Sequence, residues 1–239
     1  MRTERKADEL RPLSIEPAVA KFAAGSARIA LGDTIVLCTA SLSEGVPRWL
    51  RSSGRGWLTA EYSMLPGATP TRTAREAVRG RQSGRTMEIQ RLIGRSLRSV
   101  VDLGIVGERT IAVDCDVLQA DGGTRTASIT GAYVAVYQVA LKIKDLLGLN
   151  EVPLFDSLSA VSVGVVDGLT LLDLDYEEDS AAAVDMNVVM TGEGKLVEVQ
   201  ATAEGEPYAR ETLDEMLALA ATGAAVLAAA QTAALETLG

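Results

Sequence analysis

Apolar side chains recur with two different periods on either side of residue 120. From residue 111 to residue 118 side chains alternate between an apolar face and a face that carries Asp114 and Asp116, which is the period of a half-buried strand. The apolar positions of that strand are Ile111, Val113, Cys115 and Val117. From Ile129 to Leu147 the spacing is helical, so the sequence predicts a strand, a short turn and a long helix.

The same two patterns predict the other elements. Alternation and turn residues predict strands over 27–30, 34–39, 57–62, 160–166, 169–175, 186–190 and 196–202. Helical spacing predicts helices over 83–103 and from about residue 211 onward. The buried stripe of the first helix is Ile89, Leu92, Ile93, Leu97, Val100 and Val101. Segment 66–83 has no apolar periodicity and is long for a connection, so it is either a functional or mobile loop or a solvated one.

Together these elements predict one α+β domain over residues 1–239. We expect a mixed β-sheet with helices on one side. Residues 1–14 are expected to form an extended N-terminal arm, and residues 66–83 a basic loop. No short repeat and no break in composition divides the chain.

The composition is that of an ordinary globular protein, with 47% hydrophobic and 23% charged residues. No apolar run is expected to approach the roughly 18 residues of a membrane helix. The charged N-terminus does not resemble a secretory signal, so we expect a cytoplasmic protein without a membrane partner. Cys38 and Cys115 lie in predicted strands and are expected to be buried and reduced.

The chain contains no histidine. This excludes Ser-His-Asp and Cys-His catalysis and any histidine-ligated metal site. Acid–base chemistry must then fall to carboxylates, and a metal ion would need oxygen ligands.

The net charge of −9 hides an uneven distribution. Residues 48–98 hold eleven arginines, no lysine and three acids, whereas from residue 145 onward two basic residues oppose eighteen acids. Arginine forks suit phosphate groups, so the basic segment favours a nucleic-acid partner. The acidity of the whole chain argues weakly against such a partner, and the two parts could also neutralise each other within or between subunits.

The turn between the strand and the long helix has the features of an anion site. Gly122 and Gly123 let the backbone turn tightly and approach a ligand, and the helix start presents free N–H groups. Arg125 adds a planar cation. Arg85 lies in the first turn of the helix over 83–103, where the dipole disfavours a cation, so we expect it to have an anionic partner. The alternative is a plain helix start with a solvated Arg125.

Four aspartates lie close together in the acidic part of the chain. Asp173 and Asp175 are predicted to share one face of the strand over 169–175, and Asp179 and Asp185 lie across a short turn. Such carboxylates can raise the pKa of one member or bind Mg²⁺ or Mn²⁺, although a solvated acidic turn is the alternative. With the arginines they would supply what phosphoryl transfer needs, namely positioning, charge neutralisation and an acid.

Nine runs of the sequence, spread over nearly the whole chain, match one known pattern. They are LCTAS (37–41), GVPRWLR (45–51), GWLTAEYSMLP (56–66), GRTMEIQRLIGRSLR (84–98), DCDVLQADGGTRTASITGAY (114–133), AVSVGVVDG (160–168), LDLDYEEDS (172–180), DMNVVMT (185–191) and VEVQATAEG (197–205). In these runs the chain resembles the ribonuclease PH family of phosphate-dependent 3′-to-5′ exoribonucleases.

The resemblance implies an α+β fold like that of domain 2 of ribosomal protein S5, and a homohexamer built as a trimer of dimers. It implies that inorganic phosphate attacks the terminal 3′ phosphodiester of tRNA precursors and other structured RNA and releases a nucleoside diphosphate. The reverse reaction would add nucleotides. Mg²⁺ or Mn²⁺ is the implied cofactor, and tRNA and rRNA processing the implied role.

Residue by residue, the resemblance assigns phosphate binding to Arg85, Gly123, Thr124 and Arg125. It assigns catalysis and metal binding to Asp179 and Asp185. It assigns RNA binding to Arg72 and Arg75, to which we add Arg79 because of its charge and position.

Three features depart from the family pattern. Residues 2–6 lack the glycine turn with which the family usually opens, Ala201 replaces a usual glycine, and the C-terminal helix is unusually rich in alanine. The first departure leaves the conformation of the N-terminal arm open.

Two other functions are possible for such a sequence. The first is a catalytically silent ring subunit that holds RNA. Such a subunit can lose the phosphate-binding residues and the carboxylates, so their presence in this chain favours an enzyme. A metabolic phosphotransferase would need a G-x-x-x-x-G-K-[ST] run, which is missing.

Overall fold

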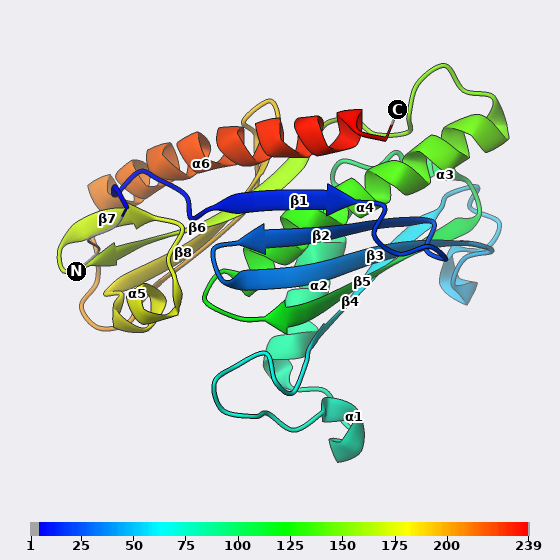
Figure 1. Ribbon diagram of the computed structural model, residues 1–239. Helices are drawn as coiled ribbons and strands as arrows, with labels where there is room; N and C mark the ends of the chain where they lie inside the picture. Colours follow the sequence, from blue (N-terminus) through cyan, green and yellow to red (C-terminus); the bar gives the residue numbers. More distant parts are fainter. Residues whose placement is uncertain (1–4, 239) are drawn as a thin grey trace.

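The computed structural model describes residues 5–238 and contains two β-sheets (Figure 1). The first sheet has the strand order β1 (Leu13–Pro17), β2 (Gly25–Leu31), β3 (Thr34–Glu44), β5 (Arg109–Gln119), β4 (Trp57–Met64). All neighbours are antiparallel except β4 and β5, which are parallel. This sheet is therefore mixed, as predicted.

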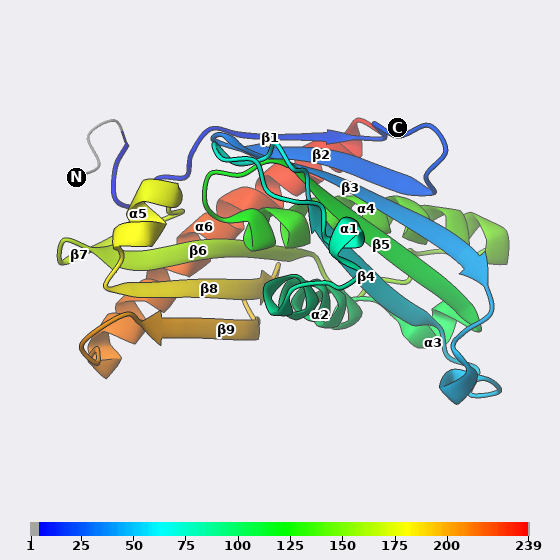
Figure 2. The ribbon, with the colours of Figure 1, turned by 90° about the horizontal axis from the view of Figure 1, so that it is seen from below.

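The second sheet is antiparallel and has the strand order β7 (Leu169–Leu172), β6 (Leu158–Val166), β8 (Val184–Thr191), β9 (Leu196–Ala203). Figure 2 shows it lying beside the first sheet. The α+β class is confirmed, but the expectation of a single sheet is wrong. Alternation along a strand predicts which face is buried and does not say which strands pair, so it could not separate the two sheets.

Helix α4 (Thr124–Leu147) lies at the centre of the fold. It packs against β2 and β3 of the first sheet and against β6 of the second. Sixteen of its 24 residues are buried, so it has almost no solvent-facing stripe. At Gly131 an added Cβ would lie 2.8 Å from Cγ2 of Ile29, which explains why the close approach of α4 to β2 needs glycine.

The helix predicted over 83–103 ends five residues earlier in the structure, at Arg98. Helix α2 (Gly84–Arg98) packs against β4 and α4, and all six residues of its predicted stripe are buried. The chain then begins α3 (Leu103–Val106), because the Asp102 side chain accepts hydrogen bonds from the N–H groups of Gly104 and Ile105 and so caps a new helix. The other short helices are η1 (Arg48–Leu50), α1 (Glu76–Arg79) and α5 (Tyr176–Ala181).

The C-terminal helix α6 (Arg210–Glu236) is long and apolar enough to cross a membrane by length and composition alone. The expectation that no apolar run approaches this length is therefore wrong, because residues 216–235 carry no charge. Much of this run is alanine, which is only weakly apolar. In the structure α6 covers β6, β7 and β8 and buries Met216 and Leu227 against them, so it packs against the sheet with one face.

Residues 66–83 form a segment that projects from the body of the molecule, here called the projecting segment (Figure 1). It is irregular apart from α1. Of the predicted N-terminal arm, residues 1–4 lie outside the described residues, so most of the altered stretch 2–6 does too. Residues 5–12 form no helix or strand. Cys38 and Cys115 are paired in register on β3 and β5 and, as predicted, are buried and free.

Candidate active site

A cleft of 410 Å³ lies between the first turns of α2 and α4 and the elements α5 and β8. It is lined by all six residues that were predicted to bind phosphate or act in catalysis: Arg85, Gly123, Thr124, Arg125, Asp179 and Asp185. These residues come from four separate elements. The fold thus unites in one place the cations and the carboxylates that the sequence holds far apart.

The glycine turn before α4 forms one wall of the cleft. Gly122 and Gly123 have φ angles of +72° and +62°, a conformation that favours glycine. A Cβ on Gly122 would also lie 2.5 Å from the carbonyl oxygen of Leu174, so a larger residue there would push the turn away from the second sheet. Because α4 begins without a side-chain cap, its first N–H groups remain available to an anion.

Arg125 is held in place by residues from two other elements. Its Nη1 lies 3.2 Å from Oε1 of Gln200 on β9 and 3.4 Å from Oε2 of Glu88 on α2. Gln200 Nε2 in turn donates to Glu88 Oε1 at 3.3 Å. The guanidinium is therefore preorganised before any ligand arrives. The neighbouring Thr124 hydroxyl makes a 2.9 Å hydrogen bond with the hydroxyl of Tyr62 on β4.

Arg85 lies in the first turn of α2, as predicted. The helix start itself is satisfied by Ser83, whose hydroxyl accepts from the N–H of Thr86 at 3.2 Å. Between residues 5 and 238, no hydrogen bond or ion pair is formed by the Arg85 guanidinium. We expected an anionic partner because the helix dipole disfavours a cation at this position. No side chain among the described residues is that partner, so the exposed guanidinium is free to bind a ligand in the cleft.

Asp179 of α5 and Asp185 of β8 form the acidic wall. Partial burial of its carboxyl and the nearby negative charge of Asp185 raise the pKa of Asp179, and the charges of Arg85 and Arg125 only partly oppose the shift. The residue as a whole is exposed, but its carboxyl lies within reach of these charges along the cleft. A carboxyl with a raised pKa keeps its proton to higher pH and is suited to act as a general acid.

The two aspartates that precede them do not line the cleft, and the prediction that they share a strand face is wrong. Strand β7 ends at Leu172, and Asp173 has a φ of +55° and is buried against Arg11. Asp175 is the N-cap of α5, where its side chain accepts from the N–H of Glu178 at 2.9 Å. Their roles are structural, because each carboxylate already accepts hydrogen bonds from nearby groups.

Reading the sequence missed cleft residues such as Asn187 and Ser162, and also Gln200, which does not line the cleft but contacts Arg125. Asn187 follows Asp185 by two positions on β8, so the period of a strand would place both on one face. The strand register then sets Ser162 of β6 and Gln200 of β9 on either side of Asn187. Asn187 could have been found from the alternation alone, whereas Ser162 and Gln200 required knowledge of which strands pair.

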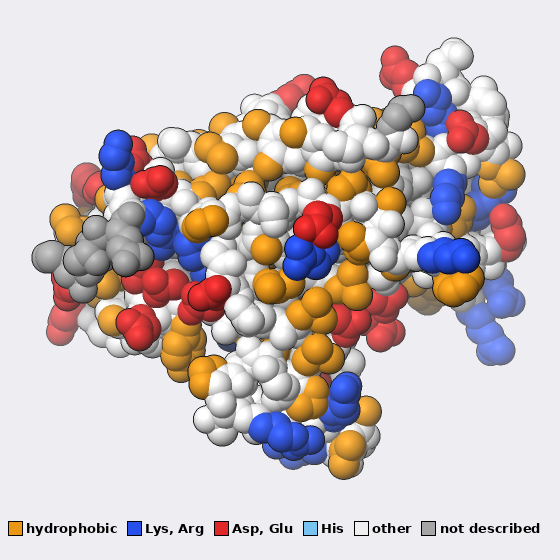
Figure 3. Space-filling model, viewed as in Figure 1, with side chains coloured by type: hydrophobic (Ala, Val, Ile, Leu, Met, Phe, Trp, Pro, Cys, Tyr) orange, Lys and Arg blue, Asp and Glu red, His pale blue; other side chains and the backbone are white. Residues whose placement is uncertain are grey.

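The arginines assigned to RNA binding lie elsewhere. Arg72, Arg75 and Arg79 are exposed on the projecting segment and do not line the cleft. Figure 3 shows basic side chains gathered at the end of this segment. The structure therefore separates a basic surface from the cleft.

Known proteins of one family match this chain along nearly its whole length. Residues 9–142 match domain 1 of the 3′ exoribonuclease family, and residues 156–223 match domain 2. A protein named Ribonuclease PH from Moorella thermoacetica is 60% identical over 223 residues, which are 93% of this chain and 89% of the relative. One of the same name from Rhodospirillum rubrum is 58% identical over 235 residues, which are 98% of both chains.

Solved structures show the same fold. The crystal structure of rice (Oryza sativa) Rrp46 has a TM-score of 0.79 at 19% identity and covers 97% of this chain and 98% of its own. A structure described as the Archaeoglobus fulgidus exosome with RNA bound to the active site has a TM-score of 0.76 at 26% identity, with 93% and 89% covered. Both family matches and both close relatives lead to one conclusion: this chain belongs to the 3′ exoribonuclease family, as a relative of ribonuclease PH.

Proposed function

We propose that this chain is a phosphorolytic 3′-to-5′ exoribonuclease that trims nucleotides from the 3′ ends of tRNA precursors and releases nucleoside diphosphates. The observation that carries the proposal is the cleft that joins Arg85, Arg125 and the start of α4 to Asp179 and Asp185. A cationic wall gives the attacking phosphate a place to bind, and the facing carboxylates can supply a proton to the leaving oxygen. The reverse reaction adds nucleotides from nucleoside diphosphates.

In this mechanism one oxygen of inorganic phosphate attacks the phosphorus of the terminal 3′ phosphodiester. The bond from that phosphorus to the 3′ oxygen of the preceding nucleotide breaks, and the terminal nucleotide leaves as a diphosphate. The 3′ oxygen takes up a proton, for which Asp179 is a candidate donor because its pKa is raised while no metal ion is bound to it. Arg85, Arg125 and the N–H groups of α4 bind the phosphate and stabilise the negative charge of the transferring group.

Mg²⁺ or Mn²⁺ fits the acidic wall. No described residue makes a hydrogen bond or ion pair with the carboxylate of Asp179 or Asp185, so both are open to a ligand. Within residues 5–238 no group of three ligating side chains could hold a metal ion unaided. This matches the habit of Mg²⁺ of using one or two carboxylates together with phosphate oxygens of the substrate. We infer that Asp179 and Asp185 hold the ion, which would neutralise phosphate charge when bound.

The assembly is proposed to be a cytoplasmic homohexamer, a trimer of dimers. The likeness to exosome structures supports a ring. Large apolar side chains such as Trp49 and Phe155 are 66% and 68% exposed, which subunit contacts would cover. We also propose that the two family segments form one domain, because the main hydrophobic cluster combines Leu158 and Val189 of the second sheet with residues of the first.

The direct test is an RNA with a short 3′ trailer, incubated with phosphate and Mg²⁺. We expect nucleoside diphosphate to appear at a rate that depends on the phosphate concentration, because phosphate is the nucleophile. Thin-layer chromatography of labelled RNA separates the products. Nucleoside monophosphate released without phosphate would instead indicate hydrolysis. Binding of RNA without any release would indicate the silent ring subunit.

The projecting segment is proposed to grip the RNA at a distance from the cleft. Replacing Arg72 and Arg75 together with alanine should weaken tRNA binding, and the slope of log K against log salt should fall by about one for each phosphate that is no longer neutralised. Filter binding at several salt concentrations measures both quantities. Arg28→Ala serves as the control, since Arg28 is a partly exposed arginine on β2 paired with Glu16. An unchanged slope in the double variant would rule out this grip.

A further inference from the structure

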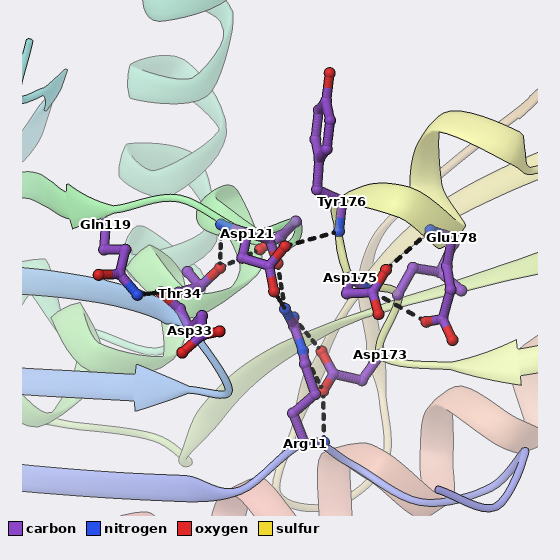
Figure 4. A network of polar contacts seen from close by, with 12 residues as sticks. Arg11, Asp33, Thr34, Gln119, Asp121, Asp173, Asp175, Tyr176 and Glu178 are labelled. Atoms are coloured by element: carbon purple, nitrogen blue, oxygen red, sulfur yellow. Dashed lines mark hydrogen bonds and ion pairs between the residues drawn. The ribbon is translucent and has the colours of Figure 1, made fainter. Parts of the chain in front are cut away.

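Arg11 is a buried cation that does not line the cleft and has no part in the proposed chemistry. It is 6% exposed, and its Nε and Nη2 donate to the two carboxylate oxygens of Asp173 at 3.0 and 2.7 Å. Its own backbone N–H donates to the same carboxylate at 2.8 Å. Figure 4 shows the guanidinium lying between Asp173 and Asp121. A buried ion pair often adds little net stability, so its use is better sought in the groups that it touches.

Arg11 touches the glycine turn but does not itself line the cleft. Its Nη1 donates to the carbonyl oxygen of Asp121, and its Nη2 would lie 3.1 Å from a Cβ added to Gly123. The buried Thr34 reaches the same turn from the start of β3. The Thr34 hydroxyl donates to the carbonyl oxygen of Gly122 at 2.6 Å and accepts from the N–H of Asp121 at 2.9 Å. Two side chains far apart from the turn in sequence therefore fix its backbone.

The same network reaches the helix that carries Asp179. The side chain of Asp121 accepts from the N–H of Tyr176, the first residue of α5, at 3.3 Å. Asp173 stands just before the α5 cap, and Arg5 joins its carboxylate to that of Glu178 on α5, at 3.4 and 3.1 Å. The N-terminal segment thus contacts the turn through Arg11 and α5 through Arg5.

We propose that Arg11 and Thr34 are positioning residues, which hold the turn 121–123 and α5 so that phosphate binds beside Asp179. The inference rests on the proposed phosphorolytic function and adds to it. The N–H groups of an anion site stabilise charge only while their directions are fixed, and the glycines of this turn have little stiffness of their own. Arg11 and Thr34 supply the rigidity that Gly122 and Gly123 lack.

The test is the phosphate dependence of nucleoside diphosphate release at saturating RNA. Thr34→Val keeps the shape of the side chain and removes both hydrogen bonds to the turn, so we expect the KM for phosphate to rise about tenfold. Thr34→Ser restores the hydroxyl and should stay within about twofold of the wild type. Arg11→Lys keeps the charge beside Asp173 but lacks the planar fork that also reaches Asp121, so a similar rise of about tenfold is expected.

Controls separate positioning from stability and from the proposed function itself. Arg28→Lys changes a partly exposed arginine paired with Glu16 and should leave the KM unchanged. All variants are assayed well below their melting temperatures, and the Kd for RNA is expected to stay within about twofold of the wild type. If the Thr34→Val and Arg11→Lys variants melt at lower temperature but keep the wild-type KM for phosphate, the positioning role is overturned. If the Arg11→Lys variant does not fold, the comparison of Thr34→Val with Thr34→Ser tests the positioning role by itself. A wild type without phosphate dependence would overturn the proposed function, and with it this inference.

Discussion

Replacing Arg125 with alanine is expected to lower phosphate-dependent turnover by about 10²–10³ while the protein stays folded and still binds RNA. The reason is the preorganisation of the side chain: Glu88 and Gln200 hold its Nη1 beside the start of α4 before phosphate arrives. Alanine removes the charge from the binding site and leaves the glycine turn in place. Initial rates at several phosphate concentrations, with melting temperature and RNA binding measured in parallel, give the comparison.

Two control variants make this result specific. Arg28→Ala removes a partly exposed arginine that also pairs with a glutamate, Glu16, but lies outside the cleft, and it should keep the wild-type rate. Arg125→Lys keeps the charge without the planar fork and should lie between alanine and the wild type. Full activity of the Arg125→Ala variant, or equal activity with and without phosphate, would remove Arg125 from the mechanism.

Much of this fold and site could be predicted because the responsible signals are local. Alternation over residues 111–118 and helical spacing after Ile129 are set by the burial of single elements, and both elements were found. Gly122 and Gly123 need left-handed φ angles, which leave a visible trace in the sequence. The six residues to which the family resemblance assigned phosphate binding or catalysis line one cleft.

The rest depends on contacts between elements that no local pattern records. Alternation did not reveal that the strands divide into two sheets. It also suggested that Asp173 continues a strand, whereas Asp173 has a positive φ and its carboxylate pairs with Arg11, which is 162 positions away. Gln200 holds Arg125 only because β9 pairs with β8 in a particular register. Such partners become visible only when the whole chain is folded.

Replacing Asp185 with asparagine is expected to reduce turnover by about 10²–10⁴ without loss of RNA binding. Asparagine has nearly the same shape, so the loss can be assigned to the negative charge that would hold the metal ion beside Asp179. The free energy of unfolding is not expected to fall. Burial raises the pKa of Asp179 and the charge of Asp185 raises it further, which means that the two charges repel each other in the folded state. Removing one of them should leave the melting temperature at neutral pH unchanged or slightly higher.

A loss of activity without a loss of stability distinguishes a functional carboxylate from a structural one. The control is Asp167→Asn, which makes the same chemical change at the exposed turn between β6 and β7. Asp167 has a φ of +50°, which asparagine tolerates, so neither rate nor melting temperature should change there. If the Asp185→Asn variant were slow and also much less stable, Asp185 would have to be reassigned to holding β8 in place. If it turned over like the wild type, the proton and the metal ion would need another residue, and no other carboxylate but Asp179 and Glu204 lines the cleft within residues 5–238.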